Sequence, residues 1–260
     1  MEEGLMPAKF SVTPVGAFSD NYIWVLRLDD RAVAVDPGDA APLLAFLRRE
    51  KLRLEAILIT HHHADHCGGL AELSRDWPDA PVYGPPGISG VTAAVKEGDE
   101  VPLAFGPAEV LAVPGHTLDH LAYRIGDHLF CGDTMFAAGC GRVFEGTPAQ
   151  LLASLKKLAQ LPPRTKVYPA HEYTLSNLRF ALAADPLNPV LAMRQSRDQA
   201  LREQGLPTLP STIAVELASN PFLRCQEPAI RASLLAQGGR ADDAEADSFA
   251  RLRAWKNDFR

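Results

Sequence analysis

The chain has 260 residues, of which 26 are Lys or Arg and 32 are Asp or Glu, so its formal net charge is −6. Hydrophobic residues make up 47% of the sequence and charged residues 22%, which is typical of a globular domain and too apolar for a disordered chain. The acidic balance argues against a nucleic-acid binder, and no apolar run approaches the ~20 residues that span a bilayer. We therefore expect one large domain, or one domain and a smaller one, with neither a membrane nor a nucleic acid as partner.

Residues 1–10 are acidic and lack the basic region followed by an apolar region that marks a signal peptide. This absence predicts a cytoplasmic protein. The sequence holds four cysteines, none in a CxxC pair. In a protein that is not exported, such cysteines are expected to be free thiols: Cys67, Cys131, Cys140 and Cys225.

The first two thirds of the chain are predicted to form short strands, which are rich in Val, Ile, Leu and aromatic residues and bounded by Gly, Pro and Asp. In chain order, we expect these strands at residues 10–15, 22–28, 32–35, 54–60, 109–113, 121–125, 128–131 and 166–168. The dipeptide Gly126-Asp127 predicts a hairpin turn between two of them.

Helices are predicted between and after these strands. Asp39 is the expected N-cap of one helix, and Thr147 with Gln150 predicts a capping box at another, with proline at the first helical position. Strand signals nearly vanish beyond about residue 174. There, helices are predicted at 189–205, 211–218, 228–237 and 243–255. The pattern indicates an α/β body followed by a small helical domain.

The segment after the predicted strand at 54–60 concentrates metal-binding side chains, with four histidines and one aspartate within six residues. Neutral imidazole and carboxylate are ligands for zinc, iron and manganese. His61 and His63 lie on the same side of an extended segment, so both can reach one metal. Asp65 and His66, where the chain bends, can reach a second. A solvated histidine-rich loop or a tag remnant is the alternative, but a tag would lie at a terminus.

Three further predicted strands each end in one candidate ligand: His116, Asp133 and His171. Each is weak evidence alone, since a single histidine after a strand is more often an ordinary surface or core residue. With the cluster they make seven candidate ligands, a number that suits two metals and a bridging carboxylate. We expect His62 to point away from its neighbours, His120 to support a ligand and His128 to belong to a hairpin.

These motifs resemble those of the metallo-β-lactamase superfamily, through residues 60–66, Gly115-His116, Gly132-Asp133 and His171. Within it, the sequence is similar to glyoxalase II, the hydroxyacylglutathione hydrolases, over nearly the whole chain. The segments that carry this closer similarity are 20–24, 35–38, 139–146, 171–174, 220–224 and 253–256. The metal motif is specific to the superfamily only, whereas the later segments and the helical tail indicate the family.

The resemblance implies an α+β fold, an αββα sandwich of metallo-β-lactamase type in residues 1–174. A small α-helical substrate-binding domain is implied in residues 175–260. The resemblance also implies two divalent metal ions but does not fix the metal, since family members use zinc, iron or manganese. We expect zinc first, with iron or manganese as alternatives. The implied ligands of the first metal are His61, His63 and His116, those of the second are Asp65, His66 and His171, and Asp133 bridges them.

The activity that the resemblance implies is hydrolysis of S-D-lactoylglutathione to D-lactate and glutathione, the second step of methylglyoxal detoxification. We expect a monomer that uses metal-bound hydroxide, with Asp65 and Asp133 as the catalytic carboxylates. The leaving thiolate needs no strong acid, because a thiol has a pKa near ~8.5.

The substrate carries two carboxylates, for which cationic side chains are the natural partners. The expected substrate-binding residues are Arg142, Phe144, Tyr173, Arg253 and Lys256. Phe144 stands where some members have Tyr, so one hydrogen bond to glutathione is expected to be missing. Asn257 stands where many members have Asp, with little expected effect. On composition alone, Arg253 and Lys256 would be read as an ordinary solvated face of the last helix.

Other members of the superfamily remain as alternatives: a lactonase, a persulfide dioxygenase or a tRNA-processing nuclease. A nuclease would be expected to add a basic surface, and a mononuclear dioxygenase would not need seven ligands. A lactonase stays open, although it has no need of Arg253 and Lys256. A non-catalytic metal- or glutathione-binding module is the alternative from another class.

Overall fold

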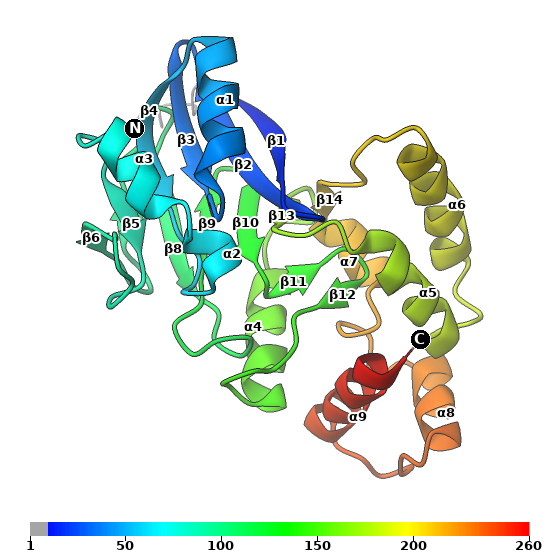
Figure 1. The fold of residues 1–260 in the computed structure, drawn as a ribbon. Coiled ribbons are helices and arrows are strands. Elements are labelled where there is room, and N and C mark those ends of the chain that lie inside the picture. Colours follow the sequence, from blue (N-terminus) through cyan, green and yellow to red (C-terminus); the bar gives the residue numbers. More distant parts are fainter. Residues whose placement is uncertain (1–9, 260) are drawn as a thin grey trace, which may run out of the picture. The chain divides into compact units, whose positions relative to one another are not determined.

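The fold is seen in a computed structural model that describes residues 10–259 (Figure 1). The expectation about a leader at residues 1–9 lies outside this range. The chain forms two compact units. Of the described residues, the first unit contains 10–112 together with 119–132, and the second contains 113–118 together with 133–259. The domain boundary expected at residue 174 stays a prediction.

The first unit contains a six-stranded sheet in the order β1-β2-β3-β4-β5-β6. Its first three strands are antiparallel, and β3 to β6 are parallel. The strands are β1 (Ser11–Ala17), β2 (Asn21–Leu28), β3 (Arg31–Val35), β4 (Arg53–Leu58), β5 (Val82–Gly84) and β6 (Ala93–Ala94). Because β4 ends at Leu58, the predicted strand at 54–60 was two residues too long.

Both faces of this sheet are buried. Ile23 and Val25 of β2 pack in one core cluster with residues of α1 (Ala40–Glu50) and α3 (Leu70–Asp76), and Figure 1 shows these helices beside the strands. The alternate residues Trp24 and Leu26 are also buried, although they point to the opposite face. Burial on both sides is typical of a sheet with parallel strands inside a layered fold.

A second group of strands in the first unit has the antiparallel order β10-β9-β8-β7. The strands are β7 (Glu100–Val101), β8 (Ala108–Ala112), β9 (Leu121–Ile125) and β10 (His128–Gly132). The predicted two-residue hairpin turn between β9 and β10 is confirmed. Tyr123 donates its hydroxyl to the Ile59 carbonyl (2.7 Å), and the Leu121 N–H donates to the Thr60 carbonyl (2.8 Å). These bonds fix the chain just before the histidine cluster.

The second unit combines two short strand pairs with helices. The pair β11 (Met135–Phe136) and β12 (Gly139–Cys140) is antiparallel, as is the pair β13 (Lys166–Pro169) and β14 (Ser211–Thr212). The helices are α4 (Pro148–Ala159), α5 (Thr174–Ala184), α6 (Pro189–Glu203), α7 (Ile213–Ser219), α8 (Pro228–Ala236) and α9 (Glu245–Asp258). The capping box at Thr147 and the cap of α1 at Asp39 are both confirmed.

The predictions for the helical tail were partly wrong. The helix predicted at 211–218 begins only at Ile213, because the two residues before it pair with β13. The helix predicted at 243–255 is α9, which begins and ends later. Helix α5 was not predicted, since no side chain caps it and its buried stripe includes the polar residues Thr174 and Asn177.

An aromatic cluster forms the core of the helical tail. Phe180, Phe222 and Phe249 are fully buried, and the Phe222 ring lies 5.9 Å from Phe180 and 5.7 Å from Phe249. The Trp255 ring lies 5.1 Å from Phe180. The apolar stripe of α9 therefore packs on α5 and on the segment after α7.

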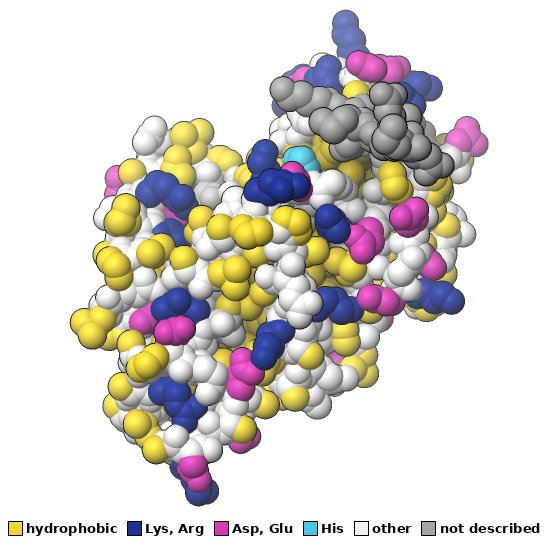
Figure 2. Space-filling model, turned by 180° about the vertical axis from the view of Figure 1, so that it is seen from behind, with side chains coloured by type: hydrophobic (Ala, Val, Ile, Leu, Met, Phe, Trp, Pro, Cys, Tyr) yellow, Lys and Arg dark blue, Asp and Glu magenta, His cyan; other side chains and the backbone are white. Residues whose placement is uncertain are grey.

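Within residues 10–259, no helix combines the length and the apolar character needed to cross a bilayer. The four cysteines are free thiols, as expected. Figure 2 shows one face of the molecule, on which Lys and Arg side chains lie scattered among acidic and hydrophobic ones. That face lacks, in its described part, the block of positive charge that a nuclease would be expected to present.

Candidate metal centre and substrate cavity

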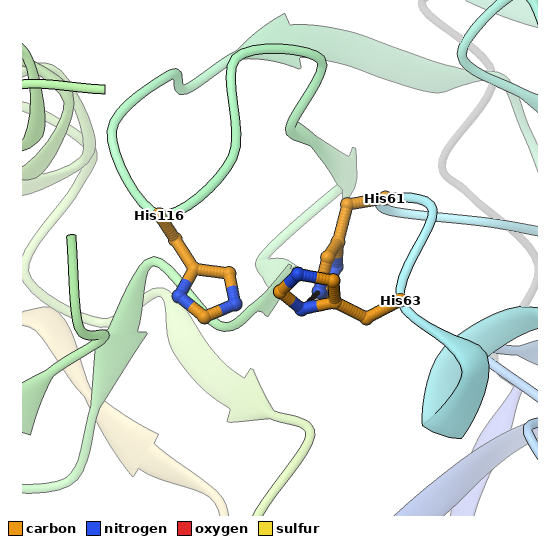
Figure 3. Close-up of side chains that lie close together, drawn as sticks. All are labelled: His61, His63 and His116. Carbon is orange, nitrogen blue, oxygen red and sulfur yellow. Dashed lines mark hydrogen bonds between the residues drawn. The ribbon is translucent and has the colours of Figure 1, made fainter. Parts of the chain in front are cut away.

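The histidine cluster follows β4 and leads into the short helix α2 (Ala64–Cys67). His61 Nε2 lies 3.1 Å from His63 Nδ1, and Figure 3 shows the two rings beside each other. The ring of His62 points elsewhere, with Nδ1 3.0 Å from an Asp119 carboxylate oxygen. The alternation predicted for an extended segment is thus confirmed. Buried His120 stacks on His61, with ring centroids 4.6 Å apart, which fits the supporting role expected for it.

The second donor pair of the first unit lies on α2 itself, where the sequence predicted only a bend. His66 Nε2 is 3.3 Å from Asp65 Oδ2, and the His66 side chain is fully buried. Asn21 donates from Nδ2 to the same Asp65 oxygen at 3.0 Å. A Cβ atom at Gly38 would lie 1.9 Å from the Asp65 carbonyl oxygen. Only glycine therefore allows this close approach to α2.

Asp36 orders the cluster, a role that the sequence did not predict. Its Oδ1 accepts from the Thr60 N–H (2.8 Å), and its Oδ2 accepts from the Thr60 hydroxyl (2.7 Å). The same Oδ2 lies 3.0 Å from His66 Nδ1, and the Thr60 hydroxyl lies 3.0 Å from His61 Nδ1. With the Nδ1 atoms held by oxygens, the Nε2 atoms of His61 and His66 are directed to act as ligands. The only sequence signal was the family-like segment 35–38.

The second unit carries the three other candidate ligands. Asp133 Oδ2 lies 3.4 Å from His116 Nε2, and Asp133 Oδ1 lies 3.4 Å from His171 Nε2. The two oxygens of one carboxylate thus face two different histidines, as a bridging ligand requires. His116, also drawn in Figure 3, has Nδ1 2.8 Å from the Arg142 carbonyl oxygen. Because a carbonyl only accepts, Nδ1 carries the proton and Nε2 is the metal-binding atom.

The spacing of these donors fits metal ions. Three pairs of candidate ligands have a histidine Nε2 at 3.3 to 3.4 Å from a carboxylate oxygen. These distances are longer than the usual N–H···O distance of about 2.9 Å. Two ligands that each lie about 2.1 Å from a tetrahedral ion are about 3.4 Å apart. The set contains imidazole and carboxylate, which suits zinc, iron and manganese.

A cavity of about 470 Å³ lies beside two of these ligands, His116 and Asp133, in the second unit. All five residues that the sequence predicted for substrate binding line it: Arg142, Phe144, Tyr173, Arg253 and Lys256. They come from the loop after β12, from the start of α5 and from α9. The fold thus brings them together across more than a hundred positions of sequence.

Two cationic side chains of this cavity, Lys256 and Arg253, differ in how they are held. Lys256 Nζ donates to the Ser176 carbonyl at 3.2 Å. Burial, together with Arg253, Arg179 and Arg142 nearby, lowers the pKa of Lys256 to about 8. Arg253 is buried and donates from Nη1 to the Cys140 carbonyl at 2.8 Å. Its guanidinium therefore holds the cavity wall as well as adding positive charge.

Two aromatic rings join the cavity to the candidate ligands. Tyr173 stacks on His171, with centroids 4.6 Å apart and planes at 6°. Phe144 meets the His116 ring edge to face at 5.2 Å and is 62% exposed. An apolar wall next to a polar ligand set is typical of small-molecule sites.

Two family models match the chain. The model described as the metallo-beta-lactamase superfamily matches residues 17–171, and the model described as hydroxyacylglutathione hydrolase C-terminus matches residues 172–259. The first covers more than half of the 260 residues. The chain therefore belongs to the metallo-β-lactamase superfamily, and the predicted fold class is confirmed.

Comparison with similar proteins identifies the family within this superfamily. A hydroxyacylglutathione hydrolase of Cupriavidus taiwanensis is 54% identical, over 96% of this chain and 99% of its own length. Among solved structures, ETHE1 from Myxococcus xanthus is 27% identical with a TM-score of 0.63, covering 95% of this chain and 99% of its own. TTHA1623, solved in a di-iron-bound form, is 28% identical with a TM-score of 0.58, covering 82% and 100%. Within the superfamily, the chain belongs to the hydroxyacylglutathione hydrolases, the glyoxalase II family.

Proposed function

We propose that this protein is a thioester hydrolase that converts S-D-lactoylglutathione to D-lactate and glutathione, the second step of methylglyoxal detoxification. Related 2-hydroxyacylglutathione thioesters are proposed as substrates too. The observation that carries the proposal is the cavity in which cationic and aromatic side chains lie beside His116 and Asp133. Such a cavity suits a substrate with an anionic tripeptide at one end and a hydrolysable bond at the other.

The proposed metal centre holds two divalent ions. One ion would be held by His61, His63 and His116. The other would be held by Asp65, His66 and His171. Asp133 would bind both ions. The superfamily model supports this assignment because all seven residues lie within the range that it matches, residues 17–171. When bound, the ions lower the pKa of water towards ~7 and polarise the substrate carbonyl. Zinc is the proposed metal, with iron or manganese able to replace it.

The protein's own contribution is to hold each ligand in the protonation state that binding needs. The Arg142 carbonyl keeps the proton of His116 on Nδ1, and Asp36 does the same for His66. Asn21 keeps one oxygen of Asp65 turned towards His66. Because these orientations exist before the substrate arrives, little reorganisation remains for the reaction itself.

Substrate binding is proposed to depend on charge complementarity. Arg142 and Lys256 would pair with the glutathione carboxylates, and Tyr173 would add its hydroxyl. Arg253 would contribute mainly by fixing the Cys140 carbonyl in the wall. Phe144 offers a ring but no hydroxyl, so this position is proposed to add only an apolar contact. The thioester carbonyl would then lie beside Asp133.

We also propose that the protein works as a cytoplasmic monomer on a small-molecule substrate. Residues 1–174 are proposed to form the catalytic domain and residues 175–260 the substrate-binding domain. The two family models support this division, since they meet between residues 171 and 172.

The test is metal analysis and a lactoylglutathione assay on one sample of the purified protein. The expected result is two metal ions per chain and release of free thiol, with Asp133→Ala losing both metal and nearly all activity. One iron per chain with oxygen consumption would instead indicate a dioxygenase. Intact thioester and fewer than two ions, after loading with zinc, iron and manganese in turn, would refute the proposal.

A further inference from the structure

The hairpin of β11 and β12 links the bridging-ligand candidate to the substrate cavity. It begins two residues after Asp133 and ends two residues before Arg142. At its base, the Gly141 N–H donates to the Thr134 carbonyl at 3.3 Å. A Cβ atom at Gly141 would lie 2.0 Å from the Asp133 carbonyl oxygen and 3.1 Å from His116 Nδ1. The position of the hairpin therefore sets the surroundings of two ligands and of Arg142.

Two fully buried side chains from the region of α7 hold this hairpin. Asn220 donates from Nδ2 to the Gly139 carbonyl (2.8 Å) and to the Phe136 carbonyl (3.2 Å). Glu216 Oε2 accepts from the Ala138 N–H at 2.8 Å and from Asn220 Nδ2 at 3.0 Å. Both strands of the hairpin and its turn are thus bonded to one pair of side chains.

Glu216 is itself fixed by a buried network. Its Oε1 accepts from Arg194 Nη2 at 2.7 Å and from the Ser211 hydroxyl. Arg194 also donates to the Ser219 hydroxyl at 2.7 Å. Removing a carboxylate from water is costly unless it is paired and hydrogen-bonded. An apolar core would join the helices at least as well, so the network is better explained by the need to hold the hairpin in one position.

Two other helices reach the same hairpin, but their side chains also line the cavity. Asn177 of α5 donates to the Ala137 carbonyl at 3.1 Å, and Arg253 of α9 donates to the Cys140 carbonyl. Changes at these two residues would alter the cavity directly. Among the described residues that line the cavity, neither Glu216 nor Asn220 appears. An effect of changing them on the cavity is therefore indirect.

We propose that Asn220 and Glu216 are positioning residues of the active site. They fix the β11–β12 hairpin, and through it the placement of Asp133 and Arg142 and the carbonyl that sets the tautomer of His116. The inference rests on the proposed function, because it assumes that these residues hold metal and substrate. It assigns a role to Asn220 within segment 220–224, one of the segments that resemble the family.

Asn188 provides a matched control in the same unit. Like Asn220 it precedes a proline, and the Oδ1 of each accepts from the backbone N–H two residues on, at 3.0 Å and 3.1 Å respectively. Asn188 Nδ2 donates to the Asp185 carboxylate and to the Ala218 carbonyl, both at 2.9 Å. The two asparagines thus make the same kinds of bonds, but these partners of Asn188 lie outside the hairpin.

The experiment compares Asn220→Ser with Asn188→Ser in the full-length protein. Serine keeps an oxygen for the backbone N–H and loses the amide donor. The measurements are the thermal midpoint, zinc affinity by chelator competition, and KM and kcat for lactoylglutathione.

Asn220→Ser should weaken binding of the more loosely held ion about tenfold and raise KM. Excess zinc should restore part of kcat but leave KM raised. Asn188→Ser should lower the midpoint similarly and leave affinity and KM within about twofold.

Equal changes in the two variants, or unchanged zinc affinity and KM in Asn220→Ser, would overturn the inference. If Asn220→Ser does not fold, the same measurements are made on Glu216→Gln. Glutamine keeps the shape of the side chain but weakens the hydrogen bond that the Ala138 N–H donates to this side chain. Zinc affinity is measured without any thioester. A wild-type protein that binds two ions but leaves the thioester intact would thus contradict the proposed function alone.

Discussion

Asp36 influences the metal-binding cluster without belonging to it. Its backbone lies in the left-handed region, with φ of 53°, and its two oxygens serve Thr60 and His66. These partners are 24 and 30 positions away. Local sequence patterns cannot reveal such a contact, which is why spacing could suggest candidate ligands but not the residue that supports them.

Replacing Asp36 by asparagine should weaken zinc binding by about ten- to a hundredfold, because an amide cannot accept all three of these hydrogen bonds. Chelator competition on the purified variant measures this. Asp39→Asn is the control, since asparagine caps a helix as well as aspartate does, and its zinc affinity should match the wild type. Equal affinity in the two variants would contradict the role given to Asp36.

Lys256 predicts a pH dependence of substrate binding. Its pKa is lowered from 10.5 to about 8, so the ammonium loses its charge within reach of ordinary assay conditions. KM for lactoylglutathione should rise as the pH passes through about 8, by about tenfold in total for a lost charge-assisted hydrogen bond. Lys256→Arg stays charged and should flatten this rise. A KM profile that is the same in both proteins would exclude Lys256 as the cause.

Arg253 shows where the sequence prediction of the site was incomplete. Its position three residues before Lys256 predicted a shared helical face, and both residues do line the cavity. Its hydrogen bond to Cys140 spans 113 positions, so only the folded chain shows that the guanidinium also supports the wall.

Among the elements, those with local signals were predictable. The N-caps at Asp39 and Thr147, and the turn between β9 and β10, each depend on residues within a few positions of one another. Strands β11, β12 and β14 have only two residues each. They exist because a partner segment pairs with them, and a two-residue stretch carries no readable period.

Helix α4 offers a test of these local signals. The Thr147 hydroxyl accepts from the Gln150 N–H, and Gln150 Oε1 accepts from the Thr147 N–H. Thr147→Ala should lower the free energy of unfolding by about 1 kcal/mol and the thermal midpoint by about 2 to 4 °C. Thr147→Ser keeps the cap and should stay close to the wild type. Calorimetry on both variants checks this, and equal midpoints in the two would show that the cap contributes nothing.

For the molecule as a whole, metal removal is the decisive perturbation. Ions that bind only the folded chain stabilise it by mass action, by about 2.7 kcal/mol for each ion present at a hundredfold excess over its Kd. Chelation should therefore lower the thermal midpoint by several degrees and abolish hydrolysis. Zinc, iron or manganese should restore both, whereas magnesium should restore neither because it prefers oxygen ligands. An unchanged midpoint after verified metal loss would contradict this.

The family and fold were predictable because their signals are short motifs with fixed spacing, such as the run from His61 to His66. The buried network around Glu216 was not. Its members are separated by unrelated sequence, and each one alone looks like an ordinary helical residue. Their roles depend on packing that brings α6, α7 and the β11–β12 hairpin together.

Cys140 lies in the wall of a cavity from which, on the proposed reaction, a thiol departs. Burial raises the pKa of the Cys140 thiol to about 11, despite the opposing charge of Arg253. Only the thiolate attacks a disulfide, and at neutral pH on the order of one Cys140 in ten thousand is ionised. Incubation with glutathione disulfide should therefore leave Cys140 unmodified by mass spectrometry. The proposed reaction, which releases a thiol beside this cysteine, would therefore leave this part of its own cavity wall unmodified.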